Sequence, residues 1–198
     1  EAVNVLVGAE TNFQPMPALL DRIEGTIDGL IVTSPCNPTG TMVDGDELAA
    51  LAEYCGERGI RLVSDEIYHG ITYGDVAETA LRLTDDAIII NSFSKYFSMT
   101  GWRLGWMVVP EAHIRAVERL AQNMFICPPH AAQVAALGAL SPEGRAELDR
   151  HRDTYAVNRA LMLEGLARAG FDKVAPADGA FYVYADVSEH TADSLSFA

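Results

Sequence analysis

The sequence places a lysine where amine chemistry is possible. Lys95 ends the run Ser92-Phe93-Ser94-Lys95, which continues an apolar stretch at 86–92. A lysine at the end of a buried strand, among small hydroxyl side chains, can be partly removed from water, and a neutral amine in such a place is nucleophilic. Such an amine can form a Schiff base with a carbonyl compound. Taken alone, a single lysine is more often a surface residue whose ammonium reaches water.

Three further clusters offer polar groups of complementary kinds. They are Asn37 in SPCNPTG, Asp65 and Tyr68 in DEIY, and Arg103 in GWRLG. A buried carboxylate needs a cation or hydrogen-bond donors, and a guanidinium between glycines suits bidentate phosphate binding. Each cluster alone also has an ordinary explanation: a proline-glycine turn, a helix cap beside a core tyrosine, or a surface arginine in a glycine turn.

Predicted strands and helices alternate through the first part of the chain. Short apolar, β-branched runs predict strands at 29–34, 60–64, 86–92 and 103–109. Helical spacing predicts a helix at 44–58, capped by Asp44 and stopped by Gly59, and another that begins at Pro110. This order predicts an α/β fold with a mainly parallel sheet flanked by helices on both faces. The four clusters would then lie at strand ends, which is where such sheets bind ligands.

The pattern changes further along the chain. An alanine-rich helix is predicted at 129–140, a long charged helix from Ser141 to Gly170, and an aromatic, β-branched strand at 180–187. We therefore expect a domain change near residue 150, which divides the chain into residues 1–150 and 151–198.

The four motifs together resemble a known family. SPxNPTG, DEIY, SFSK and GWRLG look like the motif set of fold-type I, pyridoxal 5'-phosphate (PLP)-dependent aminotransferases of class I/II. The resemblance extends from about residue 5 to the end of the chain. It implies a PLP-dependent transferase-like fold in which residues 1–150 are part of the large PLP-binding domain. Residues 151–198 would begin a smaller α+β C-terminal domain.

The resemblance also implies a role for each polar residue. Lys95 would form the Schiff base with the cofactor, Asp65 would keep the pyridine nitrogen protonated, and Tyr68 with Asn37 would bind the phenolic oxygen. Lys95, Asp65 and Tyr68 are thus the expected catalytic residues. Phosphate ligands would be Ser92, Ser94 and Arg103. The Asn37–Pro38 bond is a candidate cis peptide, since such bonds occur before proline.

The implied activity is transamination between an amino acid and a 2-oxo acid, by a full-length protein that is a homodimer. Three family features are expected outside these residues: the glycine-rich phosphate loop, the aromatic residue that stacks on the ring, and the arginine that binds the substrate carboxylate. We therefore expect the 198-residue piece alone to be inactive.

Composition narrows the other possibilities. The net charge of −14 argues against nucleic acid or an anionic membrane as a partner. Three scattered cysteines without a CxxC pair give no metal-site spacing and favour a reducing cytoplasm. Two alternative functions stay open, because fold and cofactor do not fix the reaction. One is a PLP-dependent C–S or C–C lyase, and the other is the aminotransferase-like sensing domain of a transcription regulator.

Overall fold

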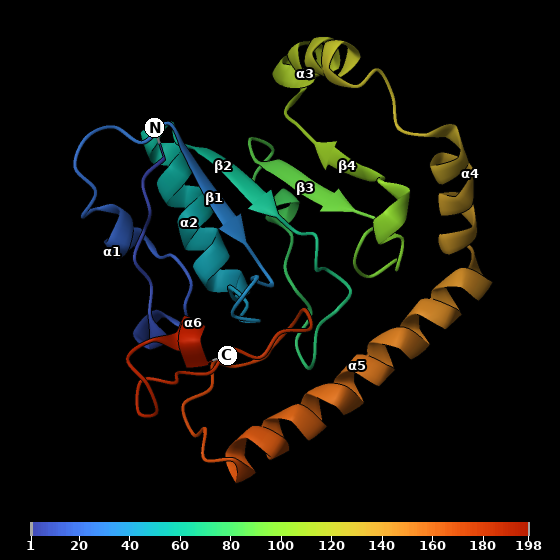
Figure 1. The fold of residues 1–198 in the computed structure, drawn as a ribbon. Coiled ribbons are helices and arrows are strands. Elements are labelled where there is room, and N and C mark those ends of the chain that lie inside the picture. The colour runs from blue at the N-terminus through green and yellow to red at the C-terminus, as the bar shows by residue number, and fades with distance from the viewer. Residues whose placement is uncertain (1, 198) are drawn as a thin grey trace.

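A four-stranded sheet forms the centre of the molecule in the computed structural model, which describes residues 2–197 (Figure 1). Its strands lie side by side in chain order: β1 (Gly29–Thr33), β2 (Arg61–Asp65), β3 (Ile88–Ser92) and β4 (Gly105–Val108). The first three strands are parallel, and β4 pairs antiparallel with β3. All four predicted strands are therefore present, and the mainly parallel sheet is confirmed.

The direction of β4 corrects one expectation. The GWRLG segment was predicted at a strand end, but it leads into β4. Because β4 runs antiparallel, its beginning lies beside the end of β3, and Gly105 is the register partner of Ser92. The segment thus lies at the edge of the sheet where β3 ends, as expected, but it precedes its strand instead of following it.

Helix α2 (Gly45–Arg58) follows the pattern that its sequence predicts. Asp44 caps it by accepting a hydrogen bond from the backbone N–H of Glu47 at 2.8 Å, and Gly59 ends it in the left-handed region with φ +66°. Its apolar residues pack against one face of the sheet in the main core, which includes Leu30, Val32, Leu48, Leu51, Cys55, Leu62 and Ile89.

The opposite face of β1 is less covered than the sequence suggests. Leu30 and Val32 are buried, but Ile31 between them is 72% exposed. Successive side chains of a strand point to opposite faces, so only the α2 side of β1 is enclosed within residues 2–197.

The second half of the chain is helical and extends around the sheet (Figure 1). It contains α3 (Glu111–Met124), α4 (His130–Ala139), the 27-residue α5 (Pro142–Arg168) and α6 (Ser194–Phe197). The shorter elements are η1 (Ala9–Thr11), α1 (Pro17–Leu20), η2 (Ala80–Arg82) and η3 (Thr100–Trp102). Residue 150 lies inside α5, so a domain change at that position stays a prediction. Within residues 2–197, no helix combines the length and the apolar character needed to cross a membrane.

The strand predicted at 180–187 is not formed. This region makes only isolated bridges, between Thr72 and Gly179 and between Val174 and Ala185. Ala180 has φ +57°, a left-handed conformation that interrupts an extended strand. The aromatic, β-branched composition therefore did not predict the conformation of this segment. Its aromatic side chains pack against residues such as Phe13 and Tyr68, but its backbone joins no sheet.

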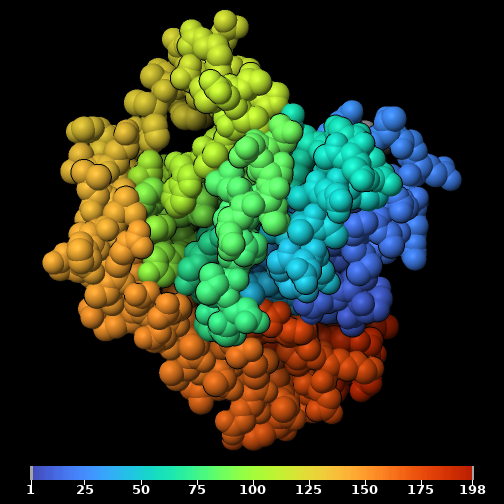
Figure 2. All heavy atoms as spheres, turned by 180° about the vertical axis from the view of Figure 1, so that it is seen from behind, coloured from blue at the N-terminus to red at the C-terminus, as the bar shows by residue number. Residues whose placement is uncertain are grey.

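Residues 178–180 attach this C-terminal region to the loops that follow β1 and β2. Gly179 donates its N–H to the Gly40 carbonyl at 2.9 Å, and Ala180 donates to the Ile71 carbonyl at 2.9 Å. A third backbone bond runs from Tyr73 N–H to the Asp178 carbonyl at 2.8 Å. Seen from behind, the C-terminal part of the chain packs directly below the residues of the sheet domain (Figure 2).

We expect Gly105→Ala to destabilise the fold at the β3–β4 pair. A Cβ at this position would lie 2.8 Å from the Asn91 carbonyl oxygen and 3.1 Å from Ser92 Cβ, so β4 would have to move away from β3. Overpacking of this kind costs about 1–3 kcal/mol. Chemical denaturation measures the loss, and Gly101→Ala is the control because no atom lies within 4 Å of its added Cβ. Equal stabilities of the two variants would contradict this account of Gly105.

Candidate active site

Lys95 lies in the loop after β3, with its amine against two aromatic rings. Its Nζ is 5.1 Å from the ring centre of Tyr68 and 5.5 Å from that of Phe181. The side chain is half-buried, and its backbone carbonyl accepts a hydrogen bond from Ser98 N–H at 3.0 Å. Lys95 therefore points toward the DEIY segment and the C-terminal region, not out into solvent as an ordinary surface lysine would.

Tyr68 is the point at which the predicted residues meet. It is 2% exposed, and burial raises the pKa of its phenol above the ordinary value of 10.0. Hydrogen bonding from Tyr182 lowers this pKa, the negative charge of Asp65 raises it, and hydrogen bonding from Asn37 lowers it again. Asn37, Asp65, Tyr68 and Lys95 therefore lie in one region at the edge of the sheet.

Local backbone structure positions the carboxylate and the amide of this group. Asp65 is the last residue of β2, and its Oδ1 accepts a hydrogen bond from the backbone N–H of Ile67 at 3.2 Å. The loop with Asn37 closes on itself, because Gly40 N–H donates to the Cys36 carbonyl at 2.8 Å and Cys36 N–H donates to the Thr41 carbonyl at 2.9 Å. The Asn37–Pro38 peptide is cis, as expected.

A second group of polar residues forms along the loop from β3 to β4. Ser94 N–H donates to Ser92 Oγ at 3.1 Å, Thr100 Oγ1 donates to the Ser94 carbonyl at 2.5 Å, and Arg103 donates from its guanidinium to the Thr100 carbonyl at 2.9 Å. These bonds bring Ser92, Ser94 and Arg103 together through Thr100. Hydroxyl groups and a guanidinium in one loop are the ligands that a phosphate group requires.

The structure adds residues that sequence patterns did not identify. Thr100 connects the serines to Arg103, and Phe181 and Tyr182 lie at Lys95 and Tyr68. The two aromatic residues belong to the segment predicted as a strand, and no spacing in the sequence distinguishes them from core residues. They reach the site because the 178–180 backbone is tied to the loops after β1 and β2.

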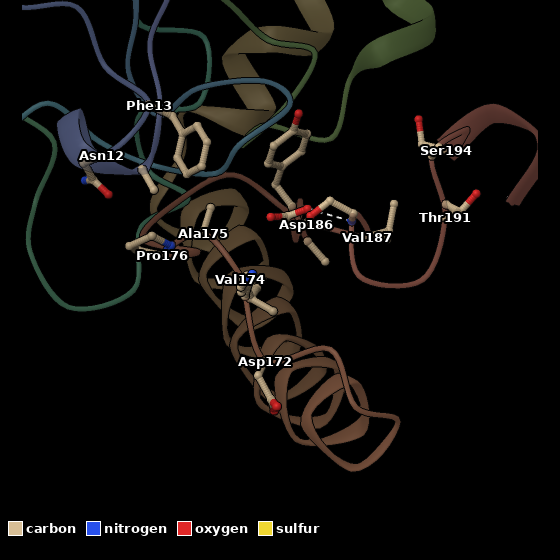
Figure 3. A pocket seen from close by; sticks show the side chains of 16 residues that line it. Asn12, Phe13, Asp172, Val174, Ala175, Pro176, Asp186, Val187, Thr191 and Ser194 are labelled. Atoms are coloured by element: carbon tan, nitrogen blue, oxygen red, sulfur yellow. Dashed lines mark hydrogen bonds between the residues drawn. The ribbon is translucent and has the colours of Figure 1, made fainter.

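A large cavity lies elsewhere and contains none of the predicted site residues. It has a volume of about 870 Å³, and Figure 3 shows Asn12 and Phe13 from the N-terminal region with Val174, Ala175 and Pro176 around it. Carboxylates, hydroxyls, the ammonium of Lys173 and apolar groups line it. Within residues 2–197, no group of three or more His, Cys, Asp or Glu residues could hold a metal ion.

Comparison with known proteins decides the family. The model of the family described as aminotransferase class I and II matches residues 6–198. The chain belongs to the class I and II aminotransferases. Enzymes of this family depend on PLP.

Similar aminotransferases share both the sequence and the fold. The valine–pyruvate aminotransferase of Mycobacterium tuberculosis is 50% identical, over 100% of this chain and 51% of that relative. A crystal structure of an aminotransferase from M. tuberculosis has a TM-score of 0.93 at 50% identity and covers 96% of this chain and 50% of that one. Aspartate aminotransferase from Thermus thermophilus with maleate has a TM-score of 0.91 at 35% identity, with 98% and 52% covered. The chain thus spans about half the length of the curated relatives that it matches.

Behind the site of this class I and II aminotransferase lies a buried carboxylate. Glu66 is 4% exposed, and its Oε1 accepts hydrogen bonds from Ser64 Oγ at 3.2 Å, Thr79 Oγ1 at 3.0 Å and Ala80 N–H at 3.0 Å. Its Oε2 lies 3.4 Å from His69 Nδ1. Glu66 therefore ties β2 to η2 and fixes the turn that carries Asp65 and Tyr68.

We expect Glu66→Ala to destabilise the aminotransferase fold by at least about 2 kcal/mol, because each buried donor left without an acceptor costs about 1–3 kcal/mol. Glu66→Gln should lose less, since its side-chain oxygen can still accept from Ser64, Thr79 and Ala80. Urea unfolding measures the difference. Glu53→Ala, at an exposed position on α2, is the control and should change stability by less than about 0.5 kcal/mol. Similar losses for Glu53→Ala and Glu66→Ala would show that Glu66 is not an anchor.

His69 predicts a pH dependence of stability. Burial lowers its pKa below the ordinary value of 6.5, although the charge of Glu66 opposes this shift, and its Nε2 is buried with no partner among the described residues. As the pH falls through 6.5, the unfolded chain takes up this proton before the folded chain does, so the free energy of unfolding decreases. His69→Asn keeps a donor toward Glu66 but cannot be protonated. The free energy of unfolding of the wild type minus that of His69→Asn should therefore fall as the pH decreases. A difference that stays constant with pH would contradict a lowered pKa of His69.

Proposed function

We propose that the protein catalyses PLP-dependent transamination between an amino acid and a 2-oxo acid. The observation that carries this proposal is the convergence of Lys95 with Tyr68, Asp65 and Asn37 at one edge of the sheet, beside the Ser92–Arg103 loop. These residues come from loops after three different strands. Family membership supports the same reaction class.

The donors and acceptors of this region fit the chemistry of PLP. A phosphate ester requires a cation and hydroxyl donors, which Arg103, Ser92 and Ser94 supply. A protonated pyridine nitrogen requires an anion, and Asp65 is the carboxylate at the end of β2. When bound, PLP withdraws electrons from the α-carbon of an amino acid and makes the proton on that carbon acidic.

Lys95 has two tasks in this proposal. Its amine would hold the cofactor covalently in the resting enzyme. Once released, the same amine would take a proton from the α-carbon of the amino donor in one half-reaction and give a proton to the α-carbon formed from the 2-oxo acid acceptor in the other. The rings of Tyr68 and Phe181 exclude water on one side of Nζ and hold it near the edge of the sheet. A single amine can therefore serve both half-reactions without leaving this position.

Asp65, Tyr68 and Asn37 act as fixed charges and donors. Asp65 keeps a proton on the ring nitrogen by pairing with it, a preorganised electrostatic stabilisation. Tyr68 and Asn37 orient the cofactor ring by hydrogen bonding to its phenolic oxygen. Each of these groups is held by backbone bonds of its own loop, so little reorganisation is needed when the cofactor binds.

We further propose an aliphatic amino donor such as valine, a homodimeric full-length protein and a cytoplasmic location. The valine–pyruvate aminotransferase of M. tuberculosis supports the donor, as does the apolar segment NMFICPPH at 123–130. Absence of nucleic-acid and membrane partners rests on the net charge of −14. The division into a large-domain part at 1–150 and a small-domain part at 151–198 is proposed on the change in sequence pattern.

Borohydride trapping of PLP tests the role of Lys95, because Lys173 is the one other lysine among these 198 residues. We expect reduction of the PLP-loaded full-length protein to place the label on the peptide with Lys95. Lys95→Ala should lose that label. Lys173→Ala is the matched control and should keep it, since Lys173 pairs with Glu189 at 2.6 Å. Mass spectrometry that finds the Lys95 peptide unlabelled in the wild-type protein would refute the proposed function.

The reaction class is tested by leaving out the amino acceptor. A transaminase releases more than one molecule of 2-oxo acid from valine per active site only when a second 2-oxo acid is present as acceptor. A lyase of the same fold needs no acceptor. Because valine has no leaving group on its β-carbon, the assay without an acceptor is repeated with an amino acid that carries sulfur on that carbon. Sustained production of 2-oxo acid from this second substrate would replace the transaminase proposal by the lyase alternative.

A further inference from the structure

The Tyr68 hydroxyl has a close partner that the sequence motifs do not include. Its oxygen lies 2.5 Å from the Tyr182 hydroxyl oxygen, and the two rings meet edge to face at 75° with centres 5.7 Å apart. Tyr182 is half-buried, next to Phe181, which packs on Tyr68 at 81°. Such a short separation between two neutral phenols leaves one hydrogen between the two oxygens, with one residue donating and the other accepting.

The surroundings favour Tyr182 as the donor. Burial and the bond to Tyr68 raise the pKa of Tyr182, and the positive charge of Lys95 acts against this rise. Burial raises the pKa of Tyr68, and the charge of Asp65 adds to this rise. A phenol oxygen has two lone pairs. When one of them accepts from Tyr182, the Tyr68 hydrogen is left to be donated to another acceptor.

Together these contacts assign a role to Tyr182. We propose that Tyr182 is a positioning residue that donates to the Tyr68 hydroxyl and thereby directs and strengthens the hydrogen bond that Tyr68 gives to the phenolic oxygen of the bound cofactor. This inference rests on the proposed function. Tyr182 acts through Tyr68, because hydrogen bonds in a chain polarise one another, and it need not touch the cofactor.

The hydrogen bond from Tyr182 to Tyr68, which we call the tyrosine relay, connects two parts of the chain that are far apart in sequence. Tyr68 follows β2, whereas Tyr182 follows the 178–180 backbone that is bonded to the loops after β1 and β2. Ala180, with φ +57°, turns the chain directly before Phe181 and Tyr182. The left-handed turn at Ala180 thus helps to place the Tyr182 hydroxyl beside that of Tyr68.

A measurable consequence follows for the bound cofactor. Donation from Tyr68 stabilises negative charge on the phenolic oxygen, so a weaker donor raises the pH at which the visible absorbance of the bound cofactor titrates. For Tyr182→Phe in the PLP-loaded full-length protein, we expect this midpoint to rise by about 0.5 to 1 pH unit, the size of one weakened hydrogen bond. Tyr68→Phe should raise it further, because the donor itself is lost.

The double variant separates a relay from an independent effect. If Tyr182 acts through Tyr68, Tyr68→Phe/Tyr182→Phe has the midpoint of Tyr68→Phe alone. Tyr184→Phe is the matched control: Tyr184 is 43% exposed, packs against Phe13 with ring centres 5.6 Å apart, and should leave the midpoint unchanged.

Several outcomes would overturn the relay. An unchanged midpoint in Tyr182→Phe is one, and additive shifts in the double variant are another. Loss of cofactor from Tyr182→Phe while Tyr68→Phe retains it is a third, since a residue acting through Tyr68 cannot cost more than Tyr68 itself. These results differ from failure of the proposed function, in which the wild-type protein itself has no cofactor trapped on Lys95.

Discussion

The hydrogen-bond ladder that joins β1, β2 and β3 determines where every polar group of the site lies. It continues one residue beyond the strands, because Ser34 N–H donates to the Asp65 carbonyl at 3.2 Å and Glu66 N–H donates to the Ile90 carbonyl at 2.9 Å. These two bonds keep the strand ends level. The loops with Asn37, Asp65 and Lys95 therefore start from a common edge, and their side chains can reach one region. A sheet with slipped register would separate them, whatever their sequence motifs.

The same ladder explains why two adjacent acids have different environments. Asp65 is the last residue of β2, and Glu66 is the next. Side chains of consecutive residues in extended chain point to opposite faces. Glu66 consequently faces η2, where three donors surround one of its oxygens, while Asp65 lies on the side of Tyr68. One carboxylate stabilises the turn, and its neighbour is free for chemistry.

Much of this arrangement could be predicted from sequence because it depends on local signals. The capped helix α2, the four apolar strands and the parallel order of the first three strands follow from periodicity and turn residues. The direction of β4 could not be predicted in this way, since a short apolar run does not show whether its strand will lie parallel or antiparallel to a neighbour. Nor could the conformation of Ala180, which depends on backbone bonds to Gly40 and Ile71, more than a hundred residues earlier in the chain. Tyr182 was missed for the same reason.

The short span before Phe181 is held from two directions. Backbone bonds join Gly179 and Ala180 to the loops of the sheet, and from α5 the side chain of Arg159 donates to the Ala177 carbonyl at 2.5 Å while lying over the Tyr73 ring at 5.3 Å. Helix α5 is thereby connected to Phe181 and Tyr182, the aromatic residues near Lys95 and Tyr68. A tilt of α5 would pull on residues 177–180, so the orientation of this largely exposed helix is coupled to the surroundings of the Lys95 amine through a single stretch of backbone.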